Sequence, residues 1–447
     1  MTTRSQGDHR RWTTAAVAGI LVALVGALAF WIAVFVVFNT PVDFYVYYMA
    51  GHHLAAGESP YTVSDAEWHQ TAADLRITHF TEPYRYPPHT AVVGRLLGPL
   101  GPRGALVAWE VGSALSFVGG AALVALALGG GWRRYALAWG ATLLYGPVYM
   151  TLMDGQVNGF AFLFLALAFW GVRRRRDGAA GTGVAVAAAL KLTPLVLVGL
   201  YLWRRAWRAA LVAVAVLAAL TLLCWPLAGT TTFVEYGTNA YRLTDPQRVN
   251  ISPYNQSFTG VAGRLLLKQT TWSTTGRAAA VHWLALVFAL ALTVTTAVAL
   301  WPRRASAPAQ ARAPGGGPDS PPPSGSVESF AFAAALSATL VVGTFTYYPQ
   351  FSWLLIPLLL VADRLLGDRR WRLLGLLAAL VLLVDLNESL WLLIRDRATF
   401  LPIDIWRMFD LPFVFAMVLW AACAGTVWRA APAAPPATAP DVSGAAA

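Results

Sequence analysis

Charged side chains are scarce in this chain. Asp, Glu, Lys and Arg make up only 12% of the 447 residues, whereas 57% are hydrophobic. Soluble domains carry about 25% charged residues, so the composition argues against a soluble fold. A soluble helical bundle rich in Leu and Ala is the alternative, but the apolar runs repeatedly reach the ~20 residues that cross a bilayer. We therefore predict a membrane protein.

Cysteine and the common catalytic motifs are also lacking. The two cysteines, Cys224 and Cys423, both lie inside apolar stretches, which excludes a disulfide framework and a cysteine-based zinc site. The sequence has no P-loop, no HExxH, no CxxC and no convincing Asp-x-Asp motif that would hold a metal and a nucleotide diphosphate. We therefore predict no metal site and no cofactor.

The basic residues are almost all arginine. The net charge is +11, yet Lys191 and Lys268 are the only lysines. A nucleic-acid-binding protein would present a basic face on a soluble domain, so we expect no nucleic-acid partner. Here the arginines fall in short loops between apolar segments, which marks the cytoplasmic side of a polytopic membrane protein. The 19 Trp residues, many close to segment ends, fit interfacial anchoring.

The apolar segments predict an all-α integral membrane protein with about 11–12 membrane segments. The first segment follows Arg10 and Arg11 and is too long for the apolar part of a signal peptide, so we expect it to be retained. In chain order the segments are Trp12–Phe38, Gly104–Leu128, Arg134–Met153, Val157–Val172, Ala179–Trp203, Trp207–Leu227, Thr275–Trp301, Phe330–Phe345, Phe351–Leu366, Leu373–Ile394 and Leu411–Trp428.

One of these segments is broken. All arginine clusters fall on one side of the membrane only if Ala179–Trp203 enters and leaves on that side. Its halves, Ala179–Leu190 and Leu195–Trp203, are each too short to cross a ~30 Å core, and Lys191 and Pro194 lie at the break. Broken membrane helices persist where protein or a water-filled cavity surrounds them. We predict a pair of short helices or a re-entrant hairpin, with Lys191 on a cavity wall and both chain termini in the cytoplasm.

Two low-complexity stretches rich in Pro, Gly, Ser or Ala divide the chain, and we predict both to be disordered. The predicted organisation is an N-terminal membrane region over 1–304 with catalytic outer loops 39–102 and 228–274, a cytoplasmic linker over 305–327, C-terminal membrane helices over 328–429 and a tail over 430–447.

Most polar residues outside the arginine clusters converge on the opposite, outer face. They lie in five stretches: 39–102, 153–158, 228–274, 347–350 and 395–409. Such convergence predicts an active site at the outer mouth of a helical bundle. The loop 39–102 ends on Pro87 and Pro88, which predict the start of a short interfacial helix running through Leu100.

Asp43 opens the first outer loop, a few residues after the first predicted span, and tyrosines surround it. A carboxylate near the membrane surface can act as general base on a sugar hydroxyl. Position alone favours the alternative that Asp43 caps a helix.

The other candidates are ligand-binding residues. Arg85 can meet an anionic lipid head group or snorkel to the interface. Capping explains Asn158, but Gln156 is not a favoured cap, which leaves a ligand or another helix as its partner. Lys191 inside an apolar segment indicates a functional or ion-paired site, with snorkelling as the alternative. The remaining candidates are the outer-loop residues Tyr86, Asn255, Gln256, Arg264, Tyr348 and Gln350.

Several stretches of the chain, in order, resemble glycosyltransferase family 87. They are DFYVYYMAGHHLAAGESPY, YRYPPHTAVVGRLLGPLG, DGQVNGFAFLFLALAF, AAGTGVAVAAALKLTPLVL and NQSFTGVAGRLL. The resemblance implies a GT-C fold with the active site on the outer face, a polyprenyl-phosphate sugar donor, inversion at the anomeric carbon and no obligatory nucleotide sugar. It also matches Asp43 to the family's acidic residue, which favours the base over the cap.

The resemblance implies a plasma-membrane enzyme that transfers a hexose, mannose above all, to a lipid-linked or glycan acceptor. Mannosyltransferase members often carry a His-His pair in a late outer loop, but the corresponding stretch YYPQFSW, residues 347–353, has no histidine. An arabinofuranosyl- or glucosyltransferase of the same architecture therefore stays open. A lipid-linked sugar transporter is a further alternative, although it would need polar residues along a path through the bundle.

Overall fold

The computed structural model describes residues 40–80, 84–242, 249–252, 254–267, 273–274, 278–301, 327–394 and 410–430, together with Gly26 and Ala29. The rest of the predicted first span lies outside the described residues. So do 302–326, which include nearly all of the predicted linker, the outer stretch 395–409 and the tail from 431.

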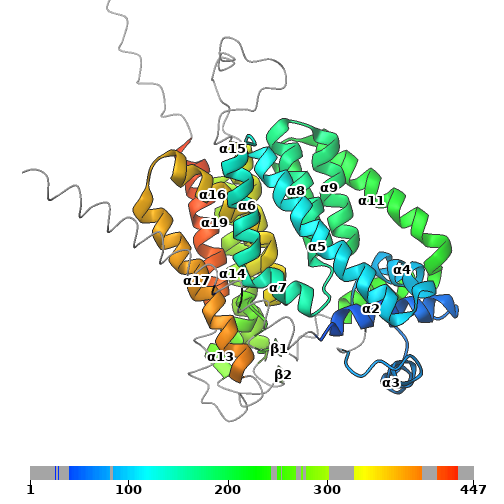
Figure 1. The fold of residues 1–447 in the computed structure, drawn as a ribbon. Coiled ribbons are helices and arrows are strands. Elements are labelled where there is room, and N and C mark those ends of the chain that lie inside the picture. The colour runs from blue at the N-terminus through cyan, green and yellow to red at the C-terminus, as the bar shows by residue number, and fades with distance from the viewer. Residues whose placement is uncertain are drawn as a thin grey trace, which may run out of the picture.

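The described part of the chain is almost entirely helical (Figure 1). Its α-helices are α2 Val42–Ala55, α3 Asp65–Asp74, α4 Pro88–Leu97, α5 Gly101–Ala127, α6 Trp132–Leu144, α7 Gly146–Met153, α8 Asn158–Arg174, α9 Asp177–Leu190, α10 Val196–Trp203, α11 Trp207–Ala228, α12 Thr230–Arg242, α13 Phe258–Leu267, α14 Ala278–Ala299, α15 Val327–Val342, α16 Leu355–Gly367, α17 Trp371–Ile394 and α19 Leu411–Arg429. Short 3₁₀ helices are η1 Gly98–Leu100, η2 Thr193–Leu195 and η3 Tyr348–Leu354, and the strands β1 Val249–Asn250 and β2 Ser273–Thr274 pair antiparallel.

Helices of membrane-spanning length confirm the predicted all-α polytopic class. Among the described residues, five helical segments are long and apolar enough to cross a bilayer: Pro88–Ala127, Trp207–Ala228, Ala279–Ala299, Tyr348–Gly367 and Leu411–Arg429. Large apolar side chains on α11 and α14 face outward, with Leu223 73% exposed and Trp283 68% exposed. Such surfaces are unfavourable in water and suit lipid.

Two predicted spans differ in detail from the helices observed. The segment predicted over Arg134–Met153 is interrupted at Tyr145, whose extended backbone separates α6 from α7. Pro147 lies in the first turn of α7, where its missing N–H costs no helical hydrogen bond. The segment predicted over Phe351–Leu366 begins as the 3₁₀ helix η3 before α16.

The arginine-rich loops meet at one end of the bundle, which we call the arginine end. Arg173 donates to the carbonyl of Ala127 at 2.7 Å, which joins the end of α8 to the end of α5. Arg134, in the first turn of α6, donates to Asp363 in the last turn of α16 at 2.7 Å. Arg204 after α10 donates to the carbonyl of Leu300 after α14 at 3.0 Å. Among the described residues, the arginine clusters therefore gather at one end as the sequence predicted. The basic clusters at 10–11 and 303–304 lie outside the described residues.

The segment predicted to break at Lys191 forms a hairpin. Lys191 has an extended backbone directly after α9, and η2 and α10 then return toward the start of α9. The Tyr201 hydroxyl near the end of α10 donates to the carbonyl of Ala180 in the first turn of α9, at 3.0 Å. Both ends of the segment therefore lie at the arginine end, and Lys191 lies at the opposite end, which we call the polar end.

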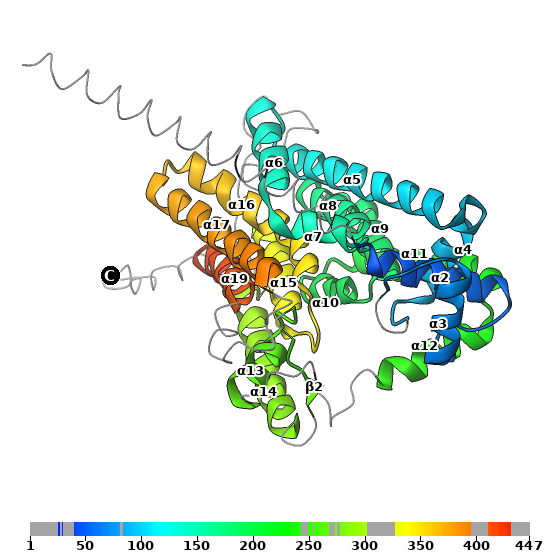
Figure 2. The same cartoon turned by 60° about the horizontal axis from the view of Figure 1, so that its bottom comes forward.

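The elements at the polar end form two groups (Figure 2). The first group contains α2, α3, α4 and α12, and the second contains α13, β1 and β2. As predicted, a short helix begins at Pro88, and this helix α4 packs closely on α2. A Cβ on Gly51 would lie 2.1 Å from the amide nitrogen of Arg95, and one on Gly94 would lie 2.0 Å from the carbonyl oxygen of Tyr47. Glycine at both positions allows the close contact that seats α2 on the bundle.

Candidate active site

Asp43 lies in the first turn of α2 and points its carboxylate into the protein. The residue is 8% exposed, and its Oδ2 accepts a 2.7 Å hydrogen bond from Nε2 of Gln156. Its backbone N–H donates to the carbonyl of Asp154 at 3.0 Å. The N-cap position belongs to Pro41 and no side chain caps the helix. The capping role that position alone favoured for Asp43 is therefore wrong.

A chain of hydrogen bonds links Asp43 to Lys191. Nδ2 of Asn158 donates to Oε1 of Gln156 at 2.5 Å, and Nζ of Lys191 donates to Oδ1 of Asn158 at 3.4 Å. Gln156 and Asn158 are buried. The N-cap of α8 is Val157, so Asn158 does not cap this helix as the sequence suggested. The two amides form one bridge from the ammonium group to the carboxylate.

Two indoles and a glycine fix the turn that carries this bridge. Gly155 has a φ of +64°, a conformation that side chains disfavour, and a Cβ there would lie 2.6 Å from Cβ of Phe44. The indole of Trp109 donates to the carbonyl of Gly155 at 2.8 Å, and that of Trp353 donates to the carbonyl of Asn158 at 3.2 Å. The turn is therefore anchored from α5 and from η3.

Aromatic rings form the wall beside Lys191. Nζ of Lys191 lies 5.7 Å from the centre of the Tyr86 ring, within cation–π range. The ring of Tyr47 meets Tyr86 edge-on at 4.6 Å, and the Tyr61 hydroxyl donates to the Tyr86 carbonyl at 2.5 Å. Burial, and then the nearby charge of Asp43, raise the pKa of Tyr86 well above its usual value. The Tyr86 phenol therefore stays protonated. Arg85, the preceding residue in the chain, is exposed.

The bridge suits chemistry that needs a base and a cation in one place. A carboxylate can accept a proton from a hydroxyl within hydrogen-bond reach. An ammonium group can offset the charge of an anionic leaving group. The aligned amides polarise one another in a buried setting, with the positive end at Lys191 and the negative end at Asp43. Such an arrangement is fit for group transfer from a phosphate.

The side chain of Asn255 makes its hydrogen bonds to other groups of the protein. Its Nδ2 donates to the carbonyls of Asn250 at 2.9 Å and Thr344 at 3.2 Å, and its Oδ1 accepts from the Thr346 N–H at 3.1 Å. The backbone N–H of Gln256 donates to the Thr346 carbonyl at 2.7 Å. These contacts join the loop after β1 to the segment before η3, so they favour a structural role for Asn255.

Arg264 is also committed to internal partners. Its guanidinium pairs with the Asp410 carboxylate, with Nε at 3.0 Å, and donates to the Ser252 carbonyl at 2.6 Å. The side chain is fully buried. These contacts join α13 to the start of α19, and none of them involves Lys191.

Tyr348 and Gln350 come from η3. The Tyr348 hydroxyl donates to Asp385 of α17 at 3.4 Å, so its partner is a buried carboxylate other than Asp43. Gln350 is buried, and within the part of the chain that the structure describes its Nε2 has no hydrogen-bond partner. Gln350 therefore keeps a donor that a ligand can use.

The structure thus brings Asp43, Tyr86, Gln156, Asn158 and Lys191 together. It adds Trp109 and Trp353, which sequence reasoning missed because Trp near a segment end is usually an interfacial anchor. The glycine of the DGQVN stretch was the available signal for the turn itself, since glycine is the usual residue in a left-handed backbone conformation.

The fold and the site define a polytopic membrane protein with a buried carboxylate–lysine bridge at one end of its helical bundle. Residues 84–315, more than half of the chain, match the model of glycosyltransferase family 87, and the chain belongs to that family. It is a membrane glycosyltransferase. Arg85, Tyr86, Gln156, Asn158 and Lys191 lie inside the matched segment, whereas Asp43 precedes it. No curated protein matches the chain.

Proposed function

We propose that this enzyme transfers a hexose, namely mannose, from a polyprenyl-phosphate sugar to a lipid-linked or glycan acceptor. The observation that carries the proposal is the buried bridge from Asp43 to Lys191 at one end of a membrane bundle. A donor attached to a membrane lipid reaches such a site from the bilayer. Membership of glycosyltransferase family 87 supplies the reaction class.

Transfer needs one bond to form and one to break at the anomeric carbon. The acceptor hydroxyl oxygen attacks this carbon from the face opposite the phosphate, which inverts the configuration. The bond between the anomeric carbon and the phosphate oxygen breaks, and its electrons leave with the polyprenyl phosphate. The Asp43 carboxylate accepts the hydroxyl proton as the new bond forms.

The departing phosphate gains negative charge, which a nearby cation stabilises. Lys191 is assigned this role because its ammonium group lies at the apex of the hairpin, between Asn158 and the Tyr86 ring. Arg85 is exposed beside Tyr86 and can bind the same phosphate as it enters or leaves. Tyr86 and Gln350 are assigned to hydrogen bonds with the sugar.

The proposed orientation is supported by the arginine end. Arginine-rich loops stay in the cytoplasm, so the polar end faces outward and the reaction takes place at the outer surface of the plasma membrane. We assign the chain to the GT-C architecture, with the membrane regions and the cytoplasmic linker in the order expected from the sequence. The acceptor then approaches from outside while the donor chain stays in lipid.

The proposal is tested by offering purified protein in lipid vesicles a panel of donors. The panel contains radiolabelled polyprenyl-phosphate mannose, glucose and arabinofuranose and a nucleotide-linked mannose, with extracted envelope glycolipids as acceptors. We expect a labelled glycolipid from polyprenyl-phosphate mannose and none from Asp43→Asn protein. Transfer of glucose or arabinofuranose instead would overturn the assignment of mannose alone. Transfer from the nucleotide sugar alone, or movement of the donor across the bilayer without a product, would overturn the donor class or the enzymatic role.

A further inference from the structure

Carboxylates gather where α17 packs on α7 and the turn that follows it. Asp385 and Glu388 are three residues apart on α17, so their side chains share one face of that helix. Both residues are buried, at 6% and 5% exposed. The charges of Asp154 and Asp385 both act on Glu388, so both carboxylates lie near it. We call Asp154, Asp385 and Glu388 the acidic cluster.

The acidic cluster has hydrogen-bonding capacity that the protein does not use. Oδ1 of Asp385 accepts from the Gly146 N–H at 2.9 Å and from the Tyr348 hydroxyl at 3.4 Å. In contrast, Oε1 of Glu388 is buried and has no hydrogen-bond partner among the described residues. Burying a polar atom without a partner costs free energy, and an acidic side chain within a membrane segment marks a functional site by default. Glu388 therefore offers an acceptor to a ligand.

The 3₁₀ helix η3 carries further unused polar groups next to the acidic cluster. Tyr348 at its start donates to the cluster, and Trp353 near its end donates to the carbonyl of Asn158. The helix η3 therefore connects the cluster to the bridge. Between these two contacts, Nε2 of Gln350 and Oγ of Ser352 are buried and lack a hydrogen-bond partner in the part of the chain that the structure describes.

The turn before α8 has the acidic cluster at one end and Lys191 at the other. Asp154 begins this turn, and its carbonyl accepts the Asp43 N–H at 3.0 Å. Asn158 ends the turn and accepts from the Lys191 ammonium group at 3.4 Å. The two charged groups come from different helices, α17 and α9, and Figures 1 and 2 show α7 between these helices. The candidate site therefore has a basic side and an acidic side.

We propose that the acidic cluster binds the acceptor through the hydroxyl groups of its terminal sugar. The inference rests on the proposed function and names the side of the site that the acceptor occupies. Carboxylates repel the donor phosphate, but they accept charge-assisted hydrogen bonds from the hydroxyls of an uncharged sugar. The acceptor attacks from the face opposite the phosphate, so it approaches from a side other than that of Lys191. One hydroxyl then faces Asp43, and a neighbouring hydroxyl donates to Glu388.

The test measures KM for the acceptor glycolipid and for the lipid-linked donor in two variants of Glu388. Glu388→Leu removes the hydrogen bond and should raise KM for the acceptor roughly 10–100-fold, the range for losing a charge-assisted hydrogen bond. Glu388→Gln keeps the size of the side chain and a neutral hydrogen bond, so its KM for the acceptor should rise about fivefold. KM for the donor should stay within about twofold of the parent in both variants.

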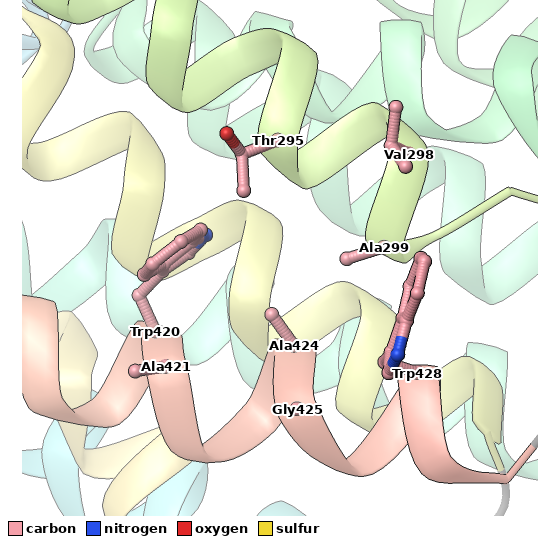
Figure 3. A pocket seen from close by; sticks show the side chains of 8 residues that line it. All are labelled: Thr295, Val298, Ala299, Trp420, Ala421, Ala424, Gly425 and Trp428. Atoms are coloured by element: carbon pink, nitrogen blue, oxygen red, sulfur yellow. The ribbon is translucent and has the colours of Figure 1, made fainter.

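A groove on a neighbouring helix provides a control for altered packing. It lies between α14 and α19, has a volume of about 380 Å³, and is lined by Thr295, Trp420, Ala421, Ala424 and Trp428 among others (Figure 3). The helix α19 packs on α17, so Ala421→Trp alters a neighbour of α17 from a position outside the acidic cluster. This variant should match the parent in KM for both substrates. A rise in its KM for the acceptor as large as that in Glu388→Gln would attribute the effect to packing and overturn the proposal.

Asp363→Asn is a matched change from carboxylate to amide at the arginine end. The Asp363 side chain is 11% exposed and pairs with Arg134 at 2.7 Å. Losing this pair should lower the midpoint of thermal unfolding, while KM for the acceptor and KM for the donor stay within about twofold of the parent. The comparison separates the loss of a buried carboxylate from the loss of a group that binds the acceptor.

Three results would contradict the proposal. Parent-like KM for the acceptor in both Glu388 variants, or equal rises in KM for donor and acceptor, would overturn the acceptor assignment while the proposed function stands. A requirement for a divalent cation that disappears in Glu388→Gln would make the acidic cluster a cation site and would overturn the assignment too. A parent protein that uses no lipid-linked donor would overturn the proposed function and the acceptor assignment together.

Discussion

Nε2 of Gln156 donates a 2.7 Å hydrogen bond to Oδ2 of Asp43, across 113 positions of sequence. This bond joins α2 to the turn before α8, and Asn158 extends it to Lys191. The carboxylate is therefore oriented by a group that the protein itself fixes. In the proposed mechanism, a base held in this way meets the acceptor hydroxyl already aligned, which is the condition for efficient proton transfer.

Asp43→Asn tests the base. An asparagine side-chain oxygen can still accept the hydrogen bond from Gln156, so the fold and donor binding should persist. The amide cannot accept a proton from the acceptor, and general base catalysis typically contributes ~10²–10⁴-fold to the rate. We expect kcat to fall by that amount, with KM for the donor and the membrane level of the protein unchanged. A purified variant with kcat within a few-fold of the parent would remove Asp43 from the mechanism.

The orientation of the bundle can be tested with cysteines at exposed positions. After Cys224 and Cys423 are replaced by alanine, Ala73→Cys labels α3 at the polar end and Asp368→Cys labels the loop after α16 at the arginine end. In intact cells a membrane-impermeant thiol reagent should label position 73 and spare position 368. Permeabilised cells should show labelling at both. The reverse pattern in intact cells would place the site in the cytoplasm.

Local sequence patterns predicted the helical architecture well. The lengths of the apolar segments predicted the helices. The hairpin was predicted from two features, the arginine clusters on one side and the short segments on either side of Lys191. These features depend on the cost of burying charge and on the length of a helix, which a sequence displays directly. The interruption at Tyr145 was missed because the segments on either side are both apolar.

Local patterns predicted the candidate site less evenly. Lys191 and Asp43 stood out from their surroundings, and the structure links them. Arg264 stood out equally, but its partner Asp410 lies 146 positions away. No local pattern distinguishes an arginine that binds a phosphate from one paired with a carboxylate of the protein, because the pairing depends on tertiary contacts.

Arg264→Met should therefore destabilise the protein rather than weaken donor binding. It leaves Asp410 largely buried without its partner, and breaking a buried ion pair in this way costs about 3–5 kcal/mol. We expect a lower midpoint of thermal unfolding in detergent and an unchanged KM for the donor in the protein that folds. Arg264→Met combined with Asp410→Asn should recover part of the stability, since no unpaired charge remains. A large rise in KM for the donor with unchanged stability would instead indicate that Arg264 binds the donor.

Lys191→Met should show the opposite behaviour. Charge-assisted hydrogen bonds contribute about 1.5–3 kcal/mol, so losing the ammonium group should lower kcat/KM for the donor roughly 10–100-fold. Part of this loss should be in kcat, because the proposed mechanism also uses Lys191 to stabilise the departing phosphate. The stability should change little, because Lys191 is half-buried at the hairpin apex and Met fills similar space. Lys191→Arg keeps the charge and should retain part of the donor affinity. Parent-like kcat/KM in Lys191→Met would show that the lysine neither binds the donor nor stabilises the departing phosphate.

Gln156→Leu separates orientation of the base from binding of the sugar. Leucine preserves the apolar contacts but removes the hydrogen bond to Asp43 and breaks the link to Asn158. A carboxylate that loses a donated hydrogen bond holds its proton to higher pH, and only the ionised form can act as base. The acidic limb of the kcat/KM profile should therefore move to higher pH, with kcat reduced at neutral pH and partly restored in alkali. If Gln156 served only to bind the sugar, KM would rise at every pH. The acidic limb of the kcat/KM profile would then lie at the same pH as in the parent protein.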